Sequence, residues 1–246
     1  MIGIIESGKA ISSMFDIETL GLRAHSYSIA APQLQTNYIE IPGRDGALDL
    51  TEALGKLSYR NRVVKFSGLF IGPEDRFHYT ISEIMNRFDG RYIKAVFDND
   101  KEHYWTGRCA VSHERIEKEL YGVTFTMTAD PYKYGLYTSD ERWLWDPFNF
   151  ETGVIREYRN ITVTTSKEIT VIGYDRELTP TITVSAAMTL QVKKHGQALW
   201  DTYNLASGQN VPSGLNIISQ DPENDYYTFK FTGTGTVSIS MREVSL

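Results

Sequence analysis

The sequence contains a single cysteine, Cys109, and no long hydrophobic run among its 246 residues. One cysteine excludes an intramolecular disulfide framework and any metal cluster built only from thiolates, and it favours a reducing compartment. No apolar segment approaches the roughly 20 residues that cross a bilayer. The apolar part of the N-terminus is too short for a signal peptide. We therefore expect a soluble protein with no membrane insertion.

The chain also lacks an excess of basic residues. It has 25 Lys and Arg against 31 Asp and Glu, a net charge of −6, and both halves are acidic: 16 basic and 18 acidic residues over 1–133, then 9 and 13 over 134–246. Because binding to a phosphate backbone needs a basic stripe, we expect no sequence-specific nucleic-acid binding and no phosphate backbone as the main partner. The content of 41% hydrophobic and 23% charged residues excludes a disordered chain.

No motif for catalysis, a cofactor or a metal is complete. Gly3 to Ala10 has the spacing of a phosphate-binding loop, but Ala10 stands where a hydroxyl would hold magnesium. Asp98 to Glu102 resembles the start of a calcium loop, although a hairpin turn explains it better. No histidine pair has metal-ligand spacing, and no Gly-x-Ser-x-Gly elbow occurs. We expect no catalytic residue, no cofactor and no metal site.

Alternating apolar and polar residues indicate a mainly β fold. Val123, Phe125, Met127 and Ala129 alternate with threonines, which predicts a half-buried strand with a threonine face. Many short segments rich in β-branched or aromatic residues follow the same pattern and end at Gly, Asn, Asp or Pro. Such spacing is typical of sandwiches and barrels rather than alternating βαβ units.

One amphipathic helix is predicted at about 74–89. Its apolar residues share one face of a helix and are Phe77, Ile81, Ile84, Met85 and Phe88. Pro73 and the acidic residues after it mark the start, and Gly90 marks the end.

A change in composition near residues 130–150 predicts two domains. Two Asp-Pro dipeptides, at 130–131 and 146–147, bracket a stretch with no clear periodicity. We expect an N-terminal β domain over 1–133, a linker over 134–150 and a C-terminal β domain over 151–246.

A series of motifs in the first half resembles the distal tail protein (Dit) family of long-tailed phages. Its parts are Pro42-Gly43-Arg44-Asp45-Gly46 with Asp49-x-Thr51 after it, Tyr59-x-x-Arg62 before a long strand, the single helix, Phe97-Asp98-Asn99-Asp100 with His103-Tyr104-Trp105, and Ala129-Asp130-Pro131-Tyr132. They occur in the family's order over roughly residues 15–135. Beyond them, Tyr158-Arg159-Asn160 and Leu178 to Val184 look like the opening of that family's galectin-like sandwich.

The resemblance implies a structural protein of the virion and not an enzyme. Dit proteins form a hexameric ring at the tail tip that joins the tail tube to the baseplate or to tail fibre and receptor-binding proteins. Their N-terminal domain, barrel-like or split-barrel with one helix, surrounds the channel for the genome, and their C-terminal sandwich projects outward. By this resemblance the protein is assembled in the host cytoplasm and resides in the tail tip.

Charged residues on the connecting segments of the N-terminal half are candidates for the subunit interface. They are Arg44, Asp45, Asp49, Arg60 and Arg62. Arginine suits such contacts because its planar guanidinium pairs bidentately with a carboxylate. The alternative is that these charges only solvate exposed turns.

Two other functions remain open. The first is a carbohydrate-binding β-sandwich protein that acts alone, with a patch such as Trp200 and Tyr226 as its binding site. The second is a glycoside hydrolase whose carboxylate pair meets only in space. A hexamer in solution would favour the ring over both.

Overall fold

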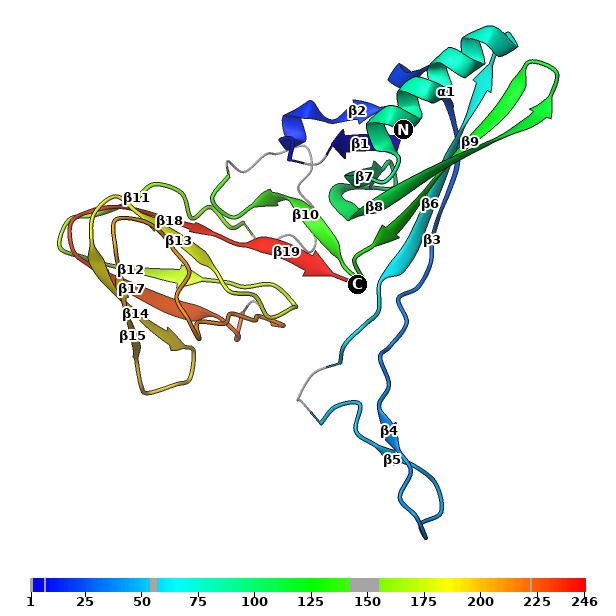
Figure 1. Cartoon of the computed structure of the whole chain (residues 1–246). Coiled ribbons are helices and arrows are strands. Elements are labelled where there is room, and N and C mark those ends of the chain that lie inside the picture. The colour runs from blue at the N-terminus through cyan, green and yellow to red at the C-terminus, as the bar shows by residue number, and fades with distance from the viewer. Residues whose placement is uncertain (1, 7, 54–56, 142–154, 222) are drawn as a thin grey trace. The chain divides into compact units, whose positions relative to one another are not determined.

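The computed structural model describes all residues except 1, 7, 54–56, 142–154 and 222. The chain divides into two compact units, Met1–Lys133 together with Leu246, and Tyr134–Ser245. Strands dominate both units, and α1 (Glu74–Phe88) is the one α-helix among the described residues (Figure 1). The predicted mainly β class is confirmed.

The first unit is built on a seven-stranded antiparallel path. Its order is β2 (Phe15–Asp16), β1 (Ile2–Glu6), β7 (Tyr92–Phe97), β8 (Asp100–Glu117), β9 (Leu120–Ala129), β6 (Arg62–Ile71) and β3 (Arg23–Ile29). Two short 3₁₀ turns, η1 (Ile11–Ser13) and η2 (Ile17–Leu20), connect the first strands. The path ends at β2 and β3 without pairing them, so within the described residues the expected barrel-like domain is an open sheet.

Strand β6 explains how the sheet acquires its two faces. Val64 and Phe66 are buried, whereas Val63 and Lys65, which alternate with them, are exposed, since successive side chains of a strand point to opposite faces. The partner strand β9 alternates in register, with Met127 beside Val64 and Thr128 beside Val63. The threonine face predicted for 123–129 is therefore the outer face of this sheet.

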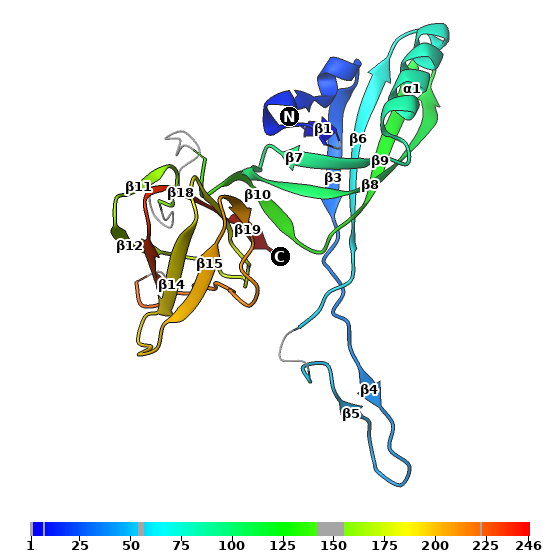
Figure 2. The ribbon, with the colours of Figure 1, turned by 60° about the vertical axis from the view of Figure 1, so that its left-hand side comes forward.

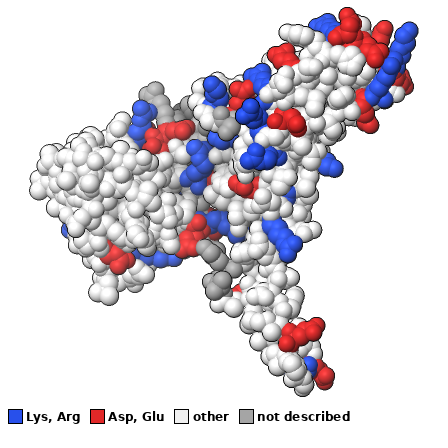
Figure 3. All heavy atoms as spheres, in the orientation of Figure 1, with Lys and Arg blue, Asp and Glu red and all other residues white. Residues whose placement is uncertain are grey.

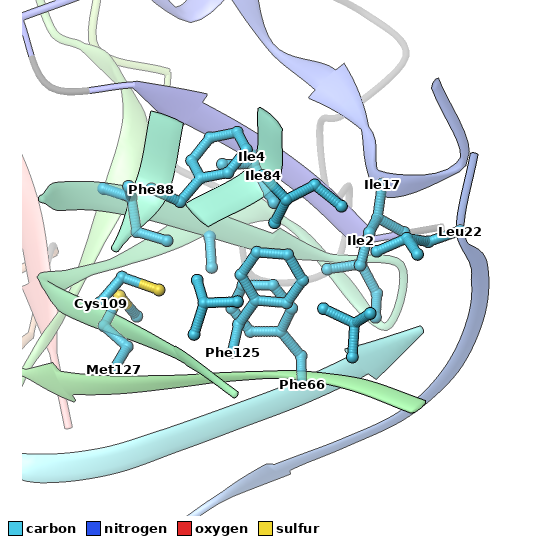
Figure 4. Close-up of a cluster of buried hydrophobic side chains, with 14 of the residues drawn as sticks. Ile2, Ile4, Ile17, Leu22, Phe66, Ile84, Phe88, Cys109, Phe125 and Met127 are labelled. Carbon is cyan, nitrogen blue, oxygen red and sulfur yellow. The ribbon is translucent and has the colours of Figure 1, made fainter. Parts of the chain in front are cut away.

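Helix α1 covers the inner face of the sheet. It spans Glu74–Phe88, as predicted, and buries Phe77, Ile81, Ile84 and Phe88. These side chains pack with residues of β1, β6, β8 and β9 in one core, of which Figure 4 shows Ile4, Phe66 and Phe125. Phe66 and Phe125 stack with their ring centroids 4.8 Å apart.

The second unit is a sandwich of two four-stranded antiparallel sheets. One has the order β11 (Ile161–Val163), β18 (Gly235–Ser240), β13 (Thr181–Val184), β16 (Gly208–Asn210). The other has the order β12 (Ser166–Val171), β17 (Tyr227–Thr232), β14 (Met188–Lys194), β15 (Asp201–Leu205), and Figure 2 shows β14 beside β15. Both sheets contribute buried side chains to one core, such as Val237 and Ile239 from the first and Phe229 and Leu190 from the second.

The segment after residue 133 corrects one boundary. Lys133–Thr138 forms strand β10, which pairs with β19 (Arg242–Ser245) of the second unit. Just after it the buried Ser139 donates its hydroxyl to the Ile239 carbonyl (2.7 Å) and accepts from the Met241 amide (2.8 Å). Residues 134–139 are thus built into the second unit, whereas the linker was predicted to begin at 134. Of its remaining residues, 140 and 141 are described, and 142–150 lie outside the described residues.

Candidate subunit interface

The strands β3 and β6 continue beyond the sheet as a two-stranded arm, here defined as residues 30–61. Backbone hydrogen bonds hold its strands together at Ala30–Val63, Gln33–Arg60 and Gln35–Ser58, with N···O distances between 2.8 and 3.0 Å. Farther out, β4 (Tyr38–Ile39) pairs with β5 (Leu48–Asp49). Figures 1 and 2 both show the arm leaving the end of β3 and β6 and extending away from the sheet.

No described residue of the arm is buried in its own chain. Apolar side chains are nevertheless prominent on it, with exposed fractions of 58% for Tyr38, 46% for Ile39, 41% for Ile41 and 38% for Leu34. A two-stranded ribbon with no core of its own is at most marginally stable in water. Exposed apolar groups gathered on such an element mark a surface that another molecule covers.

The far end of the arm is made by the glycine-rich motif. Gly43 and Gly46 adopt positive φ values of 83° and 77°, which favour glycine because a Cβ would be strained there. Between them, Arg44 and Asp45 are exposed, and the Arg44 amide donates to the Ile41 carbonyl (3.1 Å). Figure 3 shows charged side chains gathered at this end of the arm.

Asp49 is used to shape the arm. Its Oδ1 accepts from the Thr51 amide (2.8 Å), while the Thr51 hydroxyl oxygen accepts from the Asn37 amide on the opposite strand (3.1 Å). Hydrogen bonds with Thr51 hold the pKa of Asp49 below its usual range. The Asp-x-Thr motif therefore links the two strands of the arm by hydrogen bonds, and the side chain of Asp49 remains exposed.

The two arginines near the base of the arm have different surroundings. Arg60 is exposed on the arm. Arg62 is only 7% exposed: its guanidinium lies 4.4 Å from the Trp105 ring centroid and donates from Nη2 to the Pro131 carbonyl. Burial lowers the pKa of Arg62. The structure thus places Arg44, Asp45, Asp49 and Arg60 on the arm, and it corrects the expectation that Arg62 lies on a connecting segment.

The motifs that resembled chemical sites are parts of strands and turns. Gly3 and Ile4 lie within β1, which cannot wrap a phosphate. Asp98 and Asn99 form the tight turn between β7 and β8, since Phe97 pairs directly with Asp100. Asp100 bonds to Lys133 Nζ (2.5 Å) and His103 Nδ1 (2.6 Å). Within the described residues no group of three or more metal-ligating side chains is found.

The apolar residues of the arm were not among the interface residues predicted from the sequence. Tyr38, Ile39 and Ile41 lie directly before the glycine-rich motif, and Leu48 and Leu50 follow it. Apolar residues on both strands of a hairpin indicate an apolar surface that the hairpin alone cannot bury, and this signal could have identified it. Of the helices that the structure describes, none has the length and apolar character needed to cross a membrane.

Comparison with solved structures identifies the fold. The chain is similar to the crystal structure of the Dit protein (gp 19.1) of phage SPP1, described as a paradigm of the hub adsorption apparatus in phages that infect Gram-positive bacteria. The TM-score is 0.58 and the identity 12%, over 99% of both chains. Two structures of the phage p2 baseplate in its activated conformation, with calcium and with strontium, match with TM-scores of 0.40 and 0.43 and identities of 9% and 8%. They cover 99% and 98% of this chain and 96% and 97% of those chains.

No family model matches the sequence, and no curated protein matches it. The similarity therefore lies in the fold. Both units of this chain, in the same order, have the fold of the SPP1 Dit protein.

Proposed function

We propose that this protein is a distal tail protein of a long-tailed phage. In this proposal it forms a hexameric hub that joins the tail tube to the baseplate or receptor-binding proteins around the DNA channel. Two independent observations support it: a fold similar to SPP1 Dit over 99% of both chains, and the ordered motifs of the first half. The role is structural and non-enzymatic, and its place is the tail tip of the virion.

The arm is the observation that carries the proposal. Its apolar side chains have no core within the chain, so another molecule must cover them in the working state. A second copy of the chain is the partner that a closed ring supplies, with the arm of each subunit lying on a different patch of the next. A sandwich protein that binds sugar alone would have no use for a coreless ribbon of this length.

The exposed charged side chains of the arm would form ion pairs with the neighbouring subunit and so orient the contact. Arg44, Asp45 and Asp49 lie toward the end of the arm and Arg60 along it, all accessible to a neighbouring subunit. Each exposed ion pair contributes at most about 1 kcal/mol, but a closed hexamer repeats every contact six times. Arg62 is excluded from this set because it packs on Trp105 of its own chain.

A shortened arm tests the interface directly. Replacing residues 36–57 by Asn-Gly would join Gln35 to Ser58, whose backbone groups are already hydrogen-bonded at 2.8 Å. We expect the wild-type chain to reach the mass of a hexamer of 28.0 kDa subunits, alone or when mixed with its tail tube protein, as measured by light scattering. The shortened variant should remain a folded monomer under both conditions, and a hexamer formed by that variant would refute the role of the arm.

A charge reversal tests the polar part of the contact. Arg44→Glu should weaken the assembly while leaving thermal unfolding of the monomer nearly unchanged. Lys118→Glu is the matched control because Lys118 is also exposed, in the turn between β8 and β9. Equal assembly by both variants would remove Arg44 from the interface.

Antibody labelling of purified virions, imaged by electron microscopy, tests the location of the protein in the particle. Labelling anywhere except the tail tip would overturn the proposed function.

A further inference from the structure

The second unit has an outer sheet face with an unusual combination of side chains. In β14 and β17, Leu190, Val192, Phe229 and Phe231 are buried between the two sheets, so the residues that alternate with them point outward. Paired residues of neighbouring strands share a face, and β12 and β15 extend this surface on both sides. Hydroxyl and amide side chains form rows across it, namely Thr189, Gln191, Thr202, Asn204, Thr228 and Thr232.

Aromatic rings gather at one end of this outer face. Lys194 pairs with Tyr227 toward the core, so the next pair, His195 and Tyr226, faces outward. Their rings stack with centroids 4.4 Å apart, and the His195 amide donates to the Tyr226 carbonyl (2.8 Å). Trp200 lies directly before β15, at the end of the turn that joins β14 to β15. None of these three side chains is buried, so they form an aromatic cluster at the surface of the second unit.

The outer face has an excess of positive charge, whereas the second unit as a whole has an excess of negative charge. Residues 134–246 carry 13 acidic and 9 basic side chains. On the outer face, Lys193 lies with its Nζ 4.7 Å from the Trp200 ring centroid, and Lys230 lies 3.4 Å from Glu168. Asp225, next to Tyr226 in the chain, is ion-paired with Lys194. The described side chains of the face thus present two ammonium groups against one carboxylate.

This combination indicates the chemistry of the ligand. The core of a protein interface is apolar and poor in charge, whereas this face carries hydroxyl, amide and ammonium groups beside a few rings. Aromatic faces attract the polarised C–H groups on one face of a sugar ring, and neutral donors and acceptors bond to the hydroxyl groups of the sugar. Ammonium groups complement a phosphate or carboxylate on the same chain. We propose that the outer face of β12, β17, β14 and β15 binds an anionic saccharide chain.

This site is independent of the proposed hub. It lies within the second unit and uses no residue of the arm, so the full-length protein should bind saccharide whether or not it forms rings. Failure of ring formation and failure of saccharide binding are therefore separate results.

The binding test uses the full-length chain and defined oligosaccharides. The probes are sugar-substituted glycerol-phosphate oligomers, uronate oligomers, and neutral hexose and N-acetylhexosamine oligomers of equal length. Binding is followed by tryptophan fluorescence and by calorimetry. We expect at least one anionic class to bind about tenfold more tightly than the neutral probes at low salt, and the affinity to fall as salt increases. The two anionic classes separate phosphate from carboxylate recognition.

Two substitutions locate the site and one controls for surface effects. Trp200→Ala and Lys193→Gln should each weaken binding by about tenfold, and only Lys193→Gln should reduce its salt dependence. Leu199→Ala should bind as the wild type does, because Leu199 is 83% exposed beside Trp200 and offers no ring or charge. Circular dichroism confirms that each variant is folded, and Tyr226→Leu provides a second ring deletion should Trp200→Ala unfold.

Three results would overturn the proposal. One is the absence of binding to every probe. Another is binding that survives both Trp200→Ala and Lys193→Gln in folded protein. The third is equal affinity for neutral and anionic probes at low salt, which would leave the ammonium groups without a role.

Discussion

The arm continues two strands of the first unit's sheet, β3 and β6, yet its apolar side chains lie in a different environment from those of the sheet. Within the sheet, β6 alternates buried and exposed residues, and Val64 and Phe66 find a core in their own chain. Beyond Arg62 and Ile29 the ribbon continues with no buried residue among those described. The backbone pairing is similar in both parts, so pairing alone does not decide stability. What differs is whether the chain itself covers the apolar side chains.

An apolar side chain in a strand can therefore contribute to the stability of the monomer or to the stability of an assembly. Phe66 stabilises the monomer, because burying it removes apolar surface from water within one chain. In the proposed assembly Ile39 would stabilise only the contact with a neighbour, because its side chain is 46% exposed in its own chain.

Phe66→Ala should have the largest effect. Phe66 is 1% exposed and stacks on Phe125, so truncation leaves a cavity and should lower the free energy of unfolding by about 3–5 kcal/mol. Urea denaturation of the monomer measures it. Val63→Ala, on the exposed face of the same strand, should change the value by no more than about 0.5 kcal/mol. Similar losses from both would contradict the assignment of the two faces.

The thiol of Cys109 should be protected by the sheet. Burial, with a smaller contribution from the charge of Asp89, raises the pKa of Cys109 from 9.0 to about 12. A shift of that size reduces the reactive thiolate about a thousandfold, so Ellman's reagent should react only after unfolding. The arm-shortened variant should show the same protection and Phe66→Ala should lose part of it. Rapid labelling of the folded wild type would contradict this.

Asp100 should make stability depend on acid. Burial alone would raise its pKa, but the hydrogen bonds with Lys133 and His103 outweigh burial and hold the pKa below its usual value of 3.8. A carboxyl with a lowered folded pKa stabilises the fold above its unfolded pKa and loses this contribution as pH falls through the folded value. Asp100→Asn should cost about 1–2 kcal/mol at neutral pH.

The pH profile of that variant is the decisive measurement. The difference in unfolding free energy between wild type and Asp100→Asn should shrink progressively below about pH 4. Glu83→Gln, on the exposed face of α1, serves as the control and should show no such convergence. A difference that stays constant down to the acid limit would show that the ion pairs contribute nothing.

Substitutions on the arm should have the smallest effect on the monomer. Ile39→Ser combined with Ile41→Ser should change the free energy of unfolding by no more than about 0.5 kcal/mol, since both side chains are exposed. Light scattering should nevertheless show loss of assembly. A destabilised monomer with intact assembly would reverse the division between sheet and arm.

The sequence predicted the elements whose pattern is local. Helix α1 was recognised because its four buried residues repeat on one face, and β9 because apolar residues alternate with threonine. The turn at Asp98 and Asn99 followed from residues that favour tight turns. In each case the side chains that signal the element lie within a few residues of one another.

Features that depend on distant contacts were not predictable in the same way. Arg62 looked like a surface charge, but Trp105 and Pro131 lie 43 and 69 positions away in the chain and provide its pocket. Likewise, residues 134–139 showed no periodicity, and they become part of the second unit through the pairing of β10 with β19 and the bonds of Ser139 to Ile239 and Met241. The glycine-rich motif at 42–46 is visible in the sequence, whereas the arm that carries it was not predicted, because it depends on pairing between two separate segments of the chain.

The continuity of the arm with β3 and β6 has a consequence for proteolysis. A protease that cuts after Arg44 would sever an exposed loop, but the two resulting pieces remain joined through the ladder between β3 and β6 and the core beneath it. The free protein would then be nicked without falling apart, and its two fragments would separate only in denaturant. In the proposed assembly a neighbour covers the arm, so the same bond should become inaccessible. Digestion therefore offers a footprint of assembly that can be read on a gel, even from protein taken out of an intact particle.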